Sequence, residues 1–276
     1  MSRTATAPLQ VGMVTLNVRD HNRVADYYRH LLGLETIGQD GTTVQLGVNG
    51  LALLELRGNA ALVQRNPRSA GLFHTAFLMP DRQSLGVWLR HVATDRISVD
   101  GASDHLVSEA VYLHDPEGNG IEVYADRTRA QWGIDGKQIT MSTEQLDIPS
   151  LLDLAPEKSW AGAPAGLIVG HMHLRGGDNA IAEPFDSGVL GTDITAHYPG
   201  ASFYGAGGYH HQLATNIWSS RGAGPIPQNQ TGLVGFELLA DDDAQRSAIL
   251  ERAQSNQNTI TDPWGLAITL NVARES

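Results

Sequence analysis

The sequence predicts an α+β protein made of four βαβββ modules, which form two curved mixed-sheet halves. One order of elements occurs four times in the 276 residues: an alternating strand, a polar turn, an amphipathic helix, and strands ending in an apolar run. The segment DPEGNGIEV (115–123) also aligns without a gap with DPWGLAITL (262–270). In both segments, Asp-Pro and a Gly two residues after the Pro predict a tight turn before a strand. The chain therefore contains an internal repeat.

Each predicted element follows from its local pattern. The strands that open the modules show apolar alternation, and they are VGMVTLNV (11–18), GLFHTAFLMPD (71–81), LIVGHMHLRGGD (167–178) and GLVGFELLADDD (232–243). The amphipathic helices are NRVADYYRHLLGL (22–34), RQSLGVWLRHVATD (82–95) and AQRSAILERAQ (244–254). In the first of them, Val24, Tyr28 and Leu31 recur at helical spacing. The closing strands are GLALLEL (50–56), the hairpin 105–127, ASFYGAGGYHHQLATNIW (201–218) and DPWGLAITLNV (262–272).

The repeat divides the chain into two halves and a connection. Residues 1–127 carry modules one and two, and residues 166–276 carry modules three and four. Residues 128–165 have no long helical or strand pattern. They contain Trp132 and Trp160, which a flexible tether would rarely carry, so we expect a linker packed over the surface.

Composition excludes several classes of function. The formal net charge is −11 and there is no Lys/Arg cluster, so the sequence offers no basic surface that would bind the phosphates of a nucleic acid. No apolar run approaches the ~20 residues that span a bilayer, and the start MSRTATAPLQ has no signal-peptide core, which fits a cytoplasmic location. The absence of Cys removes disulfides, zinc-thiolate sites and Fe–S clusters. Any metal must therefore be held by His, Asp, Glu or other oxygen ligands.

Two motifs connect this repeat to a known family. YYRHLLGL after the first strand and DPEGNGIE before the last strand of module two resemble the vicinal-oxygen-chelate superfamily of glyoxalases, bleomycin-resistance proteins and extradiol dioxygenases. The overall likeness is to two-half bacterial catechol 2,3-dioxygenases. At the level of the superfamily, the resemblance implies a fold and the location of a metal site. The reaction has to be argued from the site itself.

The hairpin 105–127 narrows the resemblance to the extradiol dioxygenases. Their signature has a His, an apolar residue followed by Tyr, an acidic residue followed by Pro, a Gly and a Glu at set spacings. The matching residues are His105, Val111, Tyr112, Asp115, Pro116, Gly118 and Glu122. Ser103 departs from the signature, since the family usually has Gly or one of a few other residue types there. The resemblance implies acid–base roles for His105 and Tyr112, although a half-buried structural Tyr is the alternative for Tyr112.

In this superfamily, paired modules each supply a His from the first strand, and one supplies a carboxylate from its last strand. Modules one and four would offer Met13, Gly235 and Thr269, which cannot hold a hard divalent ion. Modules two and three offer the metal ligands His74, His171 and Glu122. Two His and one carboxylate are typical of Fe(II) oxygenases, and the same set suits Mn(II). His173 lies two residues from His171, on the same strand face, and is the alternative ligand.

The sequence also offers histidines for proton transfer. The strand-like GYHHQLA resembles the part of extradiol enzymes that places a His near bound oxygen, and His211 occupies that place. If the segment is a strand, His210 points to the opposite face and lies at the surface or an interface. His114 shares a face with Tyr112 and is a further supporting residue. The histidines expected to be solvated on helices or turns are His21, His30, His91 and His197.

The predicted function is extradiol ring cleavage of a catechol-type diol by O2. The rivals are a glyoxalase-like lyase or isomerase, a hydroquinone-cleaving dioxygenase, and a non-catalytic small-molecule-binding protein of the same fold. A lyase would need a second carboxylate at an equivalent strand position, and the sequence offers none there. A simple binding protein would lack the three ligands. Exposed sheet edges are compatible with a homodimer, and the ring substituents of the substrate stay open.

Overall fold

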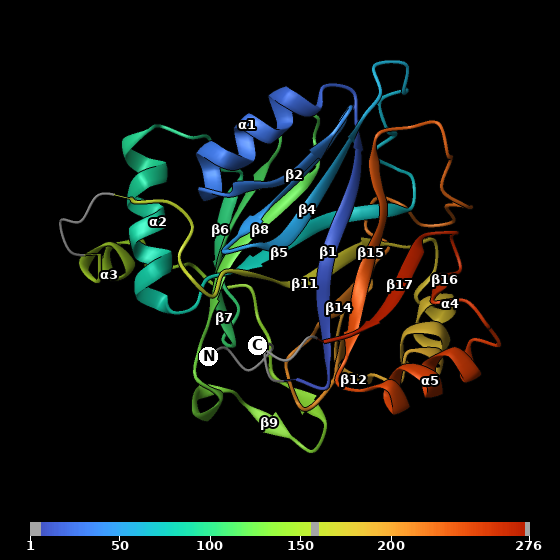
Figure 1. Cartoon of the computed structure of the whole chain (residues 1–276). Coiled ribbons are helices and arrows are strands. Elements are labelled where there is room, and N and C mark those ends of the chain that lie inside the picture. The colour runs from blue at the N-terminus through green and yellow to red at the C-terminus, as the bar shows by residue number, and fades with distance from the viewer. Residues whose placement is uncertain (1–6, 156–159, 274–276) are drawn as a thin grey trace.

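The computed structural model describes residues 7–155 and 160–273, so residues 156–159 of the predicted linker lie outside the described residues. In the described part, two large mixed sheets of seven and eight strands form the body of the protein. Helices flank these sheets (Figure 1). The architecture is therefore α+β with two curved sheets, as predicted. None of the described helices is long and apolar enough to span a membrane.

The four modules appear in chain order, with bounds close to those predicted. Module one comprises β1 (Leu9–Val18), α1 (His21–Leu32), β2 (Glu35–Asp40), β3 (Thr43–Val48) and β4 (Leu51–Gly58). Module two comprises β5 (Gly71–Leu78), α2 (Arg82–Thr94), β6 (Gly101–Asp104), β7 (Ser108–His114) and β8 (Gly120–Asp126). Module three comprises β11 (Ile168–Arg175), α4 (Asn179–Glu183), the π-helix η3 (Pro184–Val189), β12 (Asp193–Tyr198), β13 (Ala201–Gly205) and β14 (Leu213–Asn216). Module four comprises β15 (Gly232–Ala240), α5 (Asp243–Arg252), β16 (Thr259–Thr261) and β17 (Ala267–Val272). Module four thus has two strands after its helix, where the repeat predicts three.

Each sheet joins one module from each half of the chain. The seven-stranded sheet has the order β16-β17-β15-β1-β4-β3-β2, so it combines modules four and one. The eight-stranded sheet has the order β12-β13-β14-β11-β5-β8-β7-β6 and combines modules three and two. The first strands of the paired modules meet antiparallel at the centre, β1 with β15 and β5 with β11. This is the pairing that the metal-site prediction requires.

The polar turn before each module's helix contains the same capping residue. Asp20, Asp81, Asp178 and Asp242 are the N-caps of α1, α2, α4 and α5, and each side chain accepts a hydrogen bond from a backbone N–H of the first turn. An N-cap of this type stabilises a helix by ~1 kcal/mol. The aspartates therefore fix where each helix leaves its sheet.

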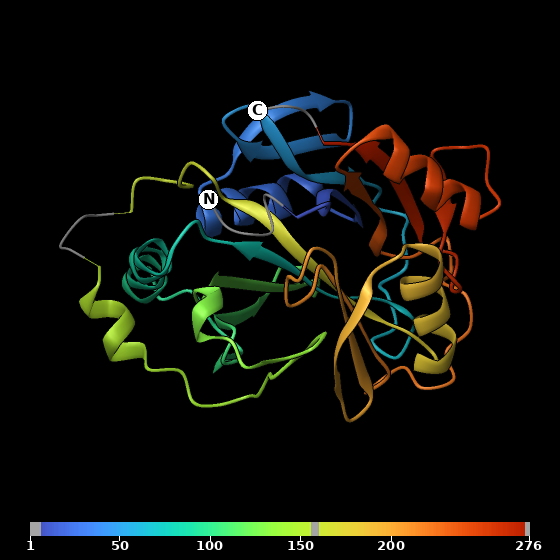
Figure 2. The same ribbon diagram turned by 90° about the horizontal axis from the view of Figure 1, so that it is seen from below.

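The helices cover the outer faces of the sheets. In α1, the predicted residues Val24, Tyr28 and Leu31 are completely buried against the core. Helix α3 (Ile148–Asp153) lies beside α2 on one side of the molecule, and α4 and α5 lie together on the other side (Figures 1 and 2). The helices thus leave the inner face of the eight-stranded sheet to the polar side chains described below.

The predicted linker is packed against the body of the protein. It contains the 3₁₀ helix η2 (Arg129–Gln131) and the short strands β9 (Ile134–Asp135) and β10 (Gln138–Ile139) before α3. Trp132 is buried against Val107 and Tyr209, and Glu144 forms a β-bridge with Asp104. The segment therefore runs across the open end of the eight-stranded sheet.

Candidate metal centre

His74, Glu122 and His171 meet at the centre of the eight-stranded sheet. They come from β5, β8 and β11, which lie side by side in that sheet. Glu122 Oε2 lies 2.9 Å from His74 Nε2 and 3.2 Å from His171 Nε2. All three side chains are buried, and their ligand atoms lie within 4.8 Å of one another. The structure thus brings together the three predicted ligands.

The geometry around His74 fits a divalent ion. Its Nε2 is buried and, among the described residues, has no hydrogen-bond partner, although Glu122 Oε2 is only 2.9 Å away. Two ligand atoms that each lie ~2.1 Å from an ion, at ~90° to each other, are ~3.0 Å apart. The distances from Glu122 to the two imidazoles match this arrangement. An ion at this point would give the buried Nε2 of His74 a partner, which a direct hydrogen bond to Glu122 does not provide.

Burial sets the protonation of these groups. It lowers the pKa of His74 below its ordinary value, so the imidazole is neutral at neutral pH and keeps a lone pair for a metal. Burial alone would raise the pKa of Glu122, but the adjacent imidazoles His171 and His74 hold it well below the ordinary value. The ionised Glu122 carboxylate and the neutral His74 imidazole are donors that Fe(II), Mn(II) or a similar ion accepts.

His173, the alternative ligand, has another partner. It lies directly opposite His74 in the β5–β11 pairing, and its Nε2 accepts a hydrogen bond of 3.0 Å from Asn216 Nδ2. It does not belong to the three-residue group whose ligand atoms converge. The geometry therefore favours His171 as the second imidazole ligand and leaves His173 as a wall of the cavity above the site.

Tyr112 and His105 form a hydrogen-bonded pair next to the metal ligands. Tyr112 lies opposite Glu122 in the β7–β8 hairpin, as the ten-residue spacing predicts, and its ring centroid is 5.6 Å from that of His74. His105 Nδ1 lies 2.6 Å from the carbonyl oxygen of Ser142, so it donates that hydrogen bond. His105 Nε2 is therefore an acceptor, and Tyr112 Oη donates to it at 2.5 Å. Burial raises the pKa of Tyr112 well above its ordinary value, so the pair holds this proton.

The structure corrects the geometry predicted for His210 and His211. Both lie in the loop between β13 and β14, so they do not alternate between faces as residues of a strand do. His211 lines the cavity, with its ring centroid 4.2 Å from that of His171. His210 is completely buried and lies at neither the surface nor an interface. His211 thus lies beside the candidate ligand His171, but strand parity is not the reason for its position.

His210 connects His211 to a carboxylate. Asp126 Oδ1 lies 3.0 Å from His210 Nε2, and His210 Nδ1 lies 2.8 Å from His211 Nδ1. When Nε2–H of His210 donates to Asp126, His210 Nδ1 can accept from His211 Nδ1–H. His211 then has a lone pair on Nε2. Burial lowers the pKa of His211 well below the ordinary value, which keeps this ring neutral.

The other histidines occupy varied environments. His114 lines the cavity and is hydrogen-bonded to Asp100. His197 is exposed as expected, but it lies in β12 at the cavity wall. His30 is exposed, and His21 is half-buried at the start of α1. The prediction for His91 is wrong, because its side chain is only 8% exposed beneath the ring of Trp160.

The three ligands lie in the wall of a cavity of about 490 Å³. This volume is within the ~300–1,000 Å³ range of small-molecule sites. Rings of Phe73, Phe203 and Trp218 contribute apolar surface, and the stretch from Gln138 to Thr143 of the linker closes another side. The cavity thus has aromatic side chains in its wall beside the three candidate ligands, which suits a small aromatic ligand.

Comparison with known proteins identifies the family. A curated protein named catechol-2,3-dioxygenase, from Bacillus subtilis (strain 168), is 37% identical over 249 residues, which cover 88% of this chain and 87% of the relative. The sequence model of the Glyoxalase/Bleomycin resistance protein/Dioxygenase superfamily matches residues 10–123. The chain belongs to this superfamily. The likeness to two-half catechol 2,3-dioxygenases is thereby confirmed at the level of sequence.

Solved structures of the superfamily's fold agree. A putative dioxygenase from Bacillus subtilis subsp. subtilis str. 168 superposes with a TM-score of 0.61 at 13% identity, covering 96% of this chain and 86% of that one. Glyoxalase I from Zea mays superposes with a TM-score of 0.56 at 13% identity, covering 99% and 95%. At such identity these likenesses concern the fold, which hosts more than one chemistry.

The second sheet of this superfamily member contains a carboxylate that the sequence reasoning missed. Glu55 on β4 pairs with Thr15 of β1, just as Glu122 on β8 pairs with Ala76 of β5. Glu55 instead accepts hydrogen bonds of 2.8 Å from Gln45 and from Arg57. No His lies on β1 or β15 to complete a metal site there. Aligning the closing strands of all four modules, rather than of two, would have found Glu55.

Sequence reasoning also missed the groups that orient the site. Asp126 and Asn216, which contact His210 and His173, lie at the ends of β8 and β14 and carry no motif. The carbonyl of Ser142 comes from the linker, far from His105 in sequence. Only the alternation of strand β8 signals that Asp126 lies on the same face as Glu122, since the two are four residues apart.

Proposed function

We propose that the chain is a metal-dependent extradiol dioxygenase, which uses O2 to open the ring of a catechol-type diol next to its two oxygens. The observation that carries the proposal is the buried group of His74, Glu122 and His171 in the wall of an aromatic-lined cavity. The curated relative named catechol-2,3-dioxygenase supports the same reaction class. Two His and one carboxylate leave open positions on an ion, as oxygenases need.

Fe(II) is the proposed ion, and Mn(II) is the alternative that the same ligands accept. When bound, the ion would supply a Lewis-acid site that binds the diol and activates O2. His74 and His171 would hold it through Nε2, and Glu122 would hold it through Oε2. The chain's other groups then have to position the diol and move its protons.

Tyr112 and His105 are the proposed proton acceptors. Because Tyr112 donates to His105 Nε2, its oxygen presents lone pairs to the cavity. A diol hydroxyl that donates to Tyr112 can pass on its proton while the Tyr112 proton moves to His105. The Ser142 carbonyl accepts from His105 Nδ1–H and stabilises the imidazolium that forms. The pair can return the proton to the opening ring.

His211 has a separate proposed role. It lies beside His171, whereas Tyr112 lies beside His74, so the two groups act on different parts of a bound ligand. Its Nδ1 is held by His210, which directs Nε2 to interactions with ligand atoms. The neutral ring would orient oxygen atoms near the metal ligands without adding a charge to the cavity.

The rival enzyme class fits the site less well. A glyoxalase-like lyase of this fold would use a second carboxylate as a base near the metal. Within the described residues, the convergent group of His74, Glu122 and His171 contains one carboxylate. The equivalent Glu55 lies in the other sheet and is hydrogen-bonded to Gln45 and Arg57. A binding protein without chemistry would not need to bury three converging ligands.

The test is reconstitution under nitrogen with Fe(II), followed by catechol and a measured amount of O2. The proposal predicts consumption of one O2 per diol and a yellow ring-opened product that carries an aldehyde and an acid. Samples with Mn(II) and without metal establish which ion supports turnover. Bound metal without oxygen uptake, across a panel of catechols and hydroquinones, would refute the dioxygenase proposal.

A further inference from the structure

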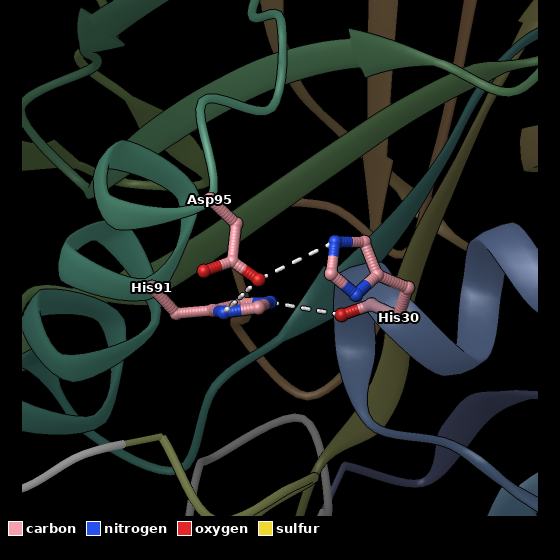
Figure 3. A group of neighbouring side chains, drawn as sticks. All are labelled: His30, His91 and Asp95. Carbon is pink, nitrogen blue, oxygen red and sulfur yellow. Dashed lines mark hydrogen bonds and ion pairs between the residues drawn. The ribbon is translucent and has the colours of Figure 1, made fainter.

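A second group of His and Asp side chains, of the types that can bind a metal, lies outside the cavity, where helices α1 and α2 end next to each other. His30 is in the last turn of α1, His91 is in the last turn of α2, and Asp95 is the C-cap residue of α2. Figure 3 shows the two rings and the carboxylate pointing toward one another. Their ligand atoms all lie within 4.8 Å of one another. The three residues come from modules one and two, and none belongs to the cavity.

The distances in this group suit a tetrahedral ion better than a hydrogen bond. Asp95 Oδ2 lies 3.5 Å from His30 Nε2 and 3.5 Å from His91 Nδ1. Strong hydrogen bonds between such atoms are ~2.7–3.2 Å long. Ligand atoms that lie ~2.0–2.1 Å from a tetrahedral ion are ~3.3–3.4 Å apart. The distances from this one carboxylate oxygen to the two imidazole nitrogens are thus close to those between ligand atoms of a tetrahedral site.

His91 is held in the tautomer that a metal needs. Its Nε2 lies 2.8 Å from the carbonyl oxygen of His30, so Nε2–H donates that hydrogen bond. Nδ1, the atom that faces Asp95, is then the ring nitrogen that a metal ion can use. A ring nitrogen bonded to a backbone carbonyl, with the other nitrogen on the ion, is the usual arrangement of ligating histidines. Trp160 stacks on the ring at an interplanar angle of 10° and fixes its plane.

The helix ends that carry the group are also fixed. Trp88 of α2 donates a hydrogen bond of 2.8 Å to the carbonyl of Leu31 in α1. Gly33 ends α1 with a left-handed φ of 68°. The ligands His91 and Asp95 are four residues apart, which places them on one side of the end of α2. The helix ends that carry the three residues are therefore held in place before any ion binds, which reduces the entropy lost on binding.

We propose that His30, His91 and Asp95 form a second site for a divalent cation of the zinc class, distinct from the metal centre in the cavity. Two imidazoles and one carboxylate are ligands that Zn²⁺ accepts, and water completes the tetrahedron on the exposed side. Bound zinc links α1 to α2 and therefore joins module one to module two. We assign it a structural role, because none of its three residues lines the cavity at the candidate metal centre or the smaller pocket beside Trp264.

The test measures zinc stoichiometry by calorimetric titration of the chain without a histidine tag. The variants Asp95→Asn and His30→Gln each remove an exposed ligand and keep the helices intact. The control is Asp26→Asn, an exposed aspartate of α1 that pairs with Arg29 instead of an imidazole. All four proteins keep the ligands in the cavity, so zinc bound there cancels in the comparison.

The proposal predicts that wild type and Asp26→Asn bind one more equivalent of zinc than either ligand variant. Zinc should also raise the melting temperature of wild type by more than that of Asp95→Asn. Equal stoichiometry in wild type and the two ligand variants would overturn the proposal. An equal zinc-dependent shift in melting temperature for wild type and Asp95→Asn would overturn the structural role.

Discussion

At the scale of single residues, hydrogen-bond partners fix which atom each side chain offers to a ligand. His105 donates to a backbone carbonyl and therefore accepts from Tyr112. His211 is bonded at Nδ1 and therefore offers Nε2. Glu122 faces two imidazoles with one oxygen. The direction of proton movement in the proposed reaction follows from the first of these observations, because Tyr112 donates to His105.

Replacing Tyr112 by Phe should slow ring cleavage without removing the metal. The change deletes the hydroxyl that links a bound diol to His105, but leaves the ring packed beside His74. Loss of a positioned proton acceptor reduces kcat by ~100-fold. Steady-state oxygen uptake and metal content per chain are the measurements. An unchanged kcat would exclude Tyr112 from proton transfer.

Replacing Glu122 by Gln should weaken Fe(II) binding at least ~100-fold, since even changes around ligands cost ~10–100-fold. The matched control is Glu55→Gln, which alters the equivalent position of the other sheet. Because Glu55 bonds to Gln45 and Arg57, the control should lose stability but keep its metal and its activity. Metal content after dialysis separates the variants. Equal iron retention in both would contradict the assignment of Glu122.

At the scale of elements, the same type of turn precedes the last strand of module two and the last strand of module four. Asp115 Oδ1 accepts from the backbone N–H groups of Glu117 and Asn119, at 2.8 and 2.9 Å. Asp262 Oδ1 accepts from those of Trp264 and Leu266, at 2.9 and 2.7 Å. Only the first turn leads into a strand that carries a carboxylate at the candidate metal centre. The turn therefore serves the fold, and Glu122 is an addition to it.

The glycines of these turns provide a matched pair of variants. Gly118 has a φ of 82° and Gly265 a φ of 84°, and an added Cβ would meet nothing within 4 Å at either position. Alanine at each should therefore cost only the left-handed backbone strain, about 1–2 kcal/mol of unfolding free energy. Urea denaturation measures this cost. Iron affinity should fall only in Gly118→Ala, because only its turn positions Glu122.

The elements were largely predictable because their signals are local. Strand alternation, the helical spacing of Val24, Tyr28 and Leu31, and the Asp-Pro turns each depend on a few neighbouring residues. The loop that carries His210 and His211 was misread as a strand because its apolar neighbours imitate alternation. Its path depends on packing against Trp132 and Asp126, which no local pattern reveals.

At the scale of the whole molecule, the candidate metal centre connects the two halves of the chain. His74 and Glu122 precede the linker, and His171 follows it. The resemblance to the superfamily implied that a site takes ligands from two paired modules, and aligning the repeat left modules two and three as the pair with suitable residues. The closing role of residues 138–143 was not predictable, since it depends on how a segment without regular pattern packs.

Metal removal should therefore destabilise the whole fold. An ion that binds only the folded chain stabilises it by ~2.7 kcal/mol at a free concentration of 100 times its Kd. For a chain of this size, chelation should lower the melting temperature by about 5–10 °C. Calorimetry of the Fe(II)-loaded protein with and without chelator measures the shift. The shift should vanish in Glu122→Gln, and its persistence there would place the stabilising ion elsewhere.

The most direct test of the central claim is a crystal structure of the Fe(II)-loaded protein, with anomalous data collected at the iron edge. The account predicts a peak in the cavity ~2.0–2.3 Å from His74 Nε2, His171 Nε2 and Glu122 Oε2. A diol soaked into the crystal should occupy positions on the ion that face Tyr112. An iron peak too far from Glu122 for coordination would contradict the account. So would crystals of iron-loaded protein that show no peak next to these three atoms.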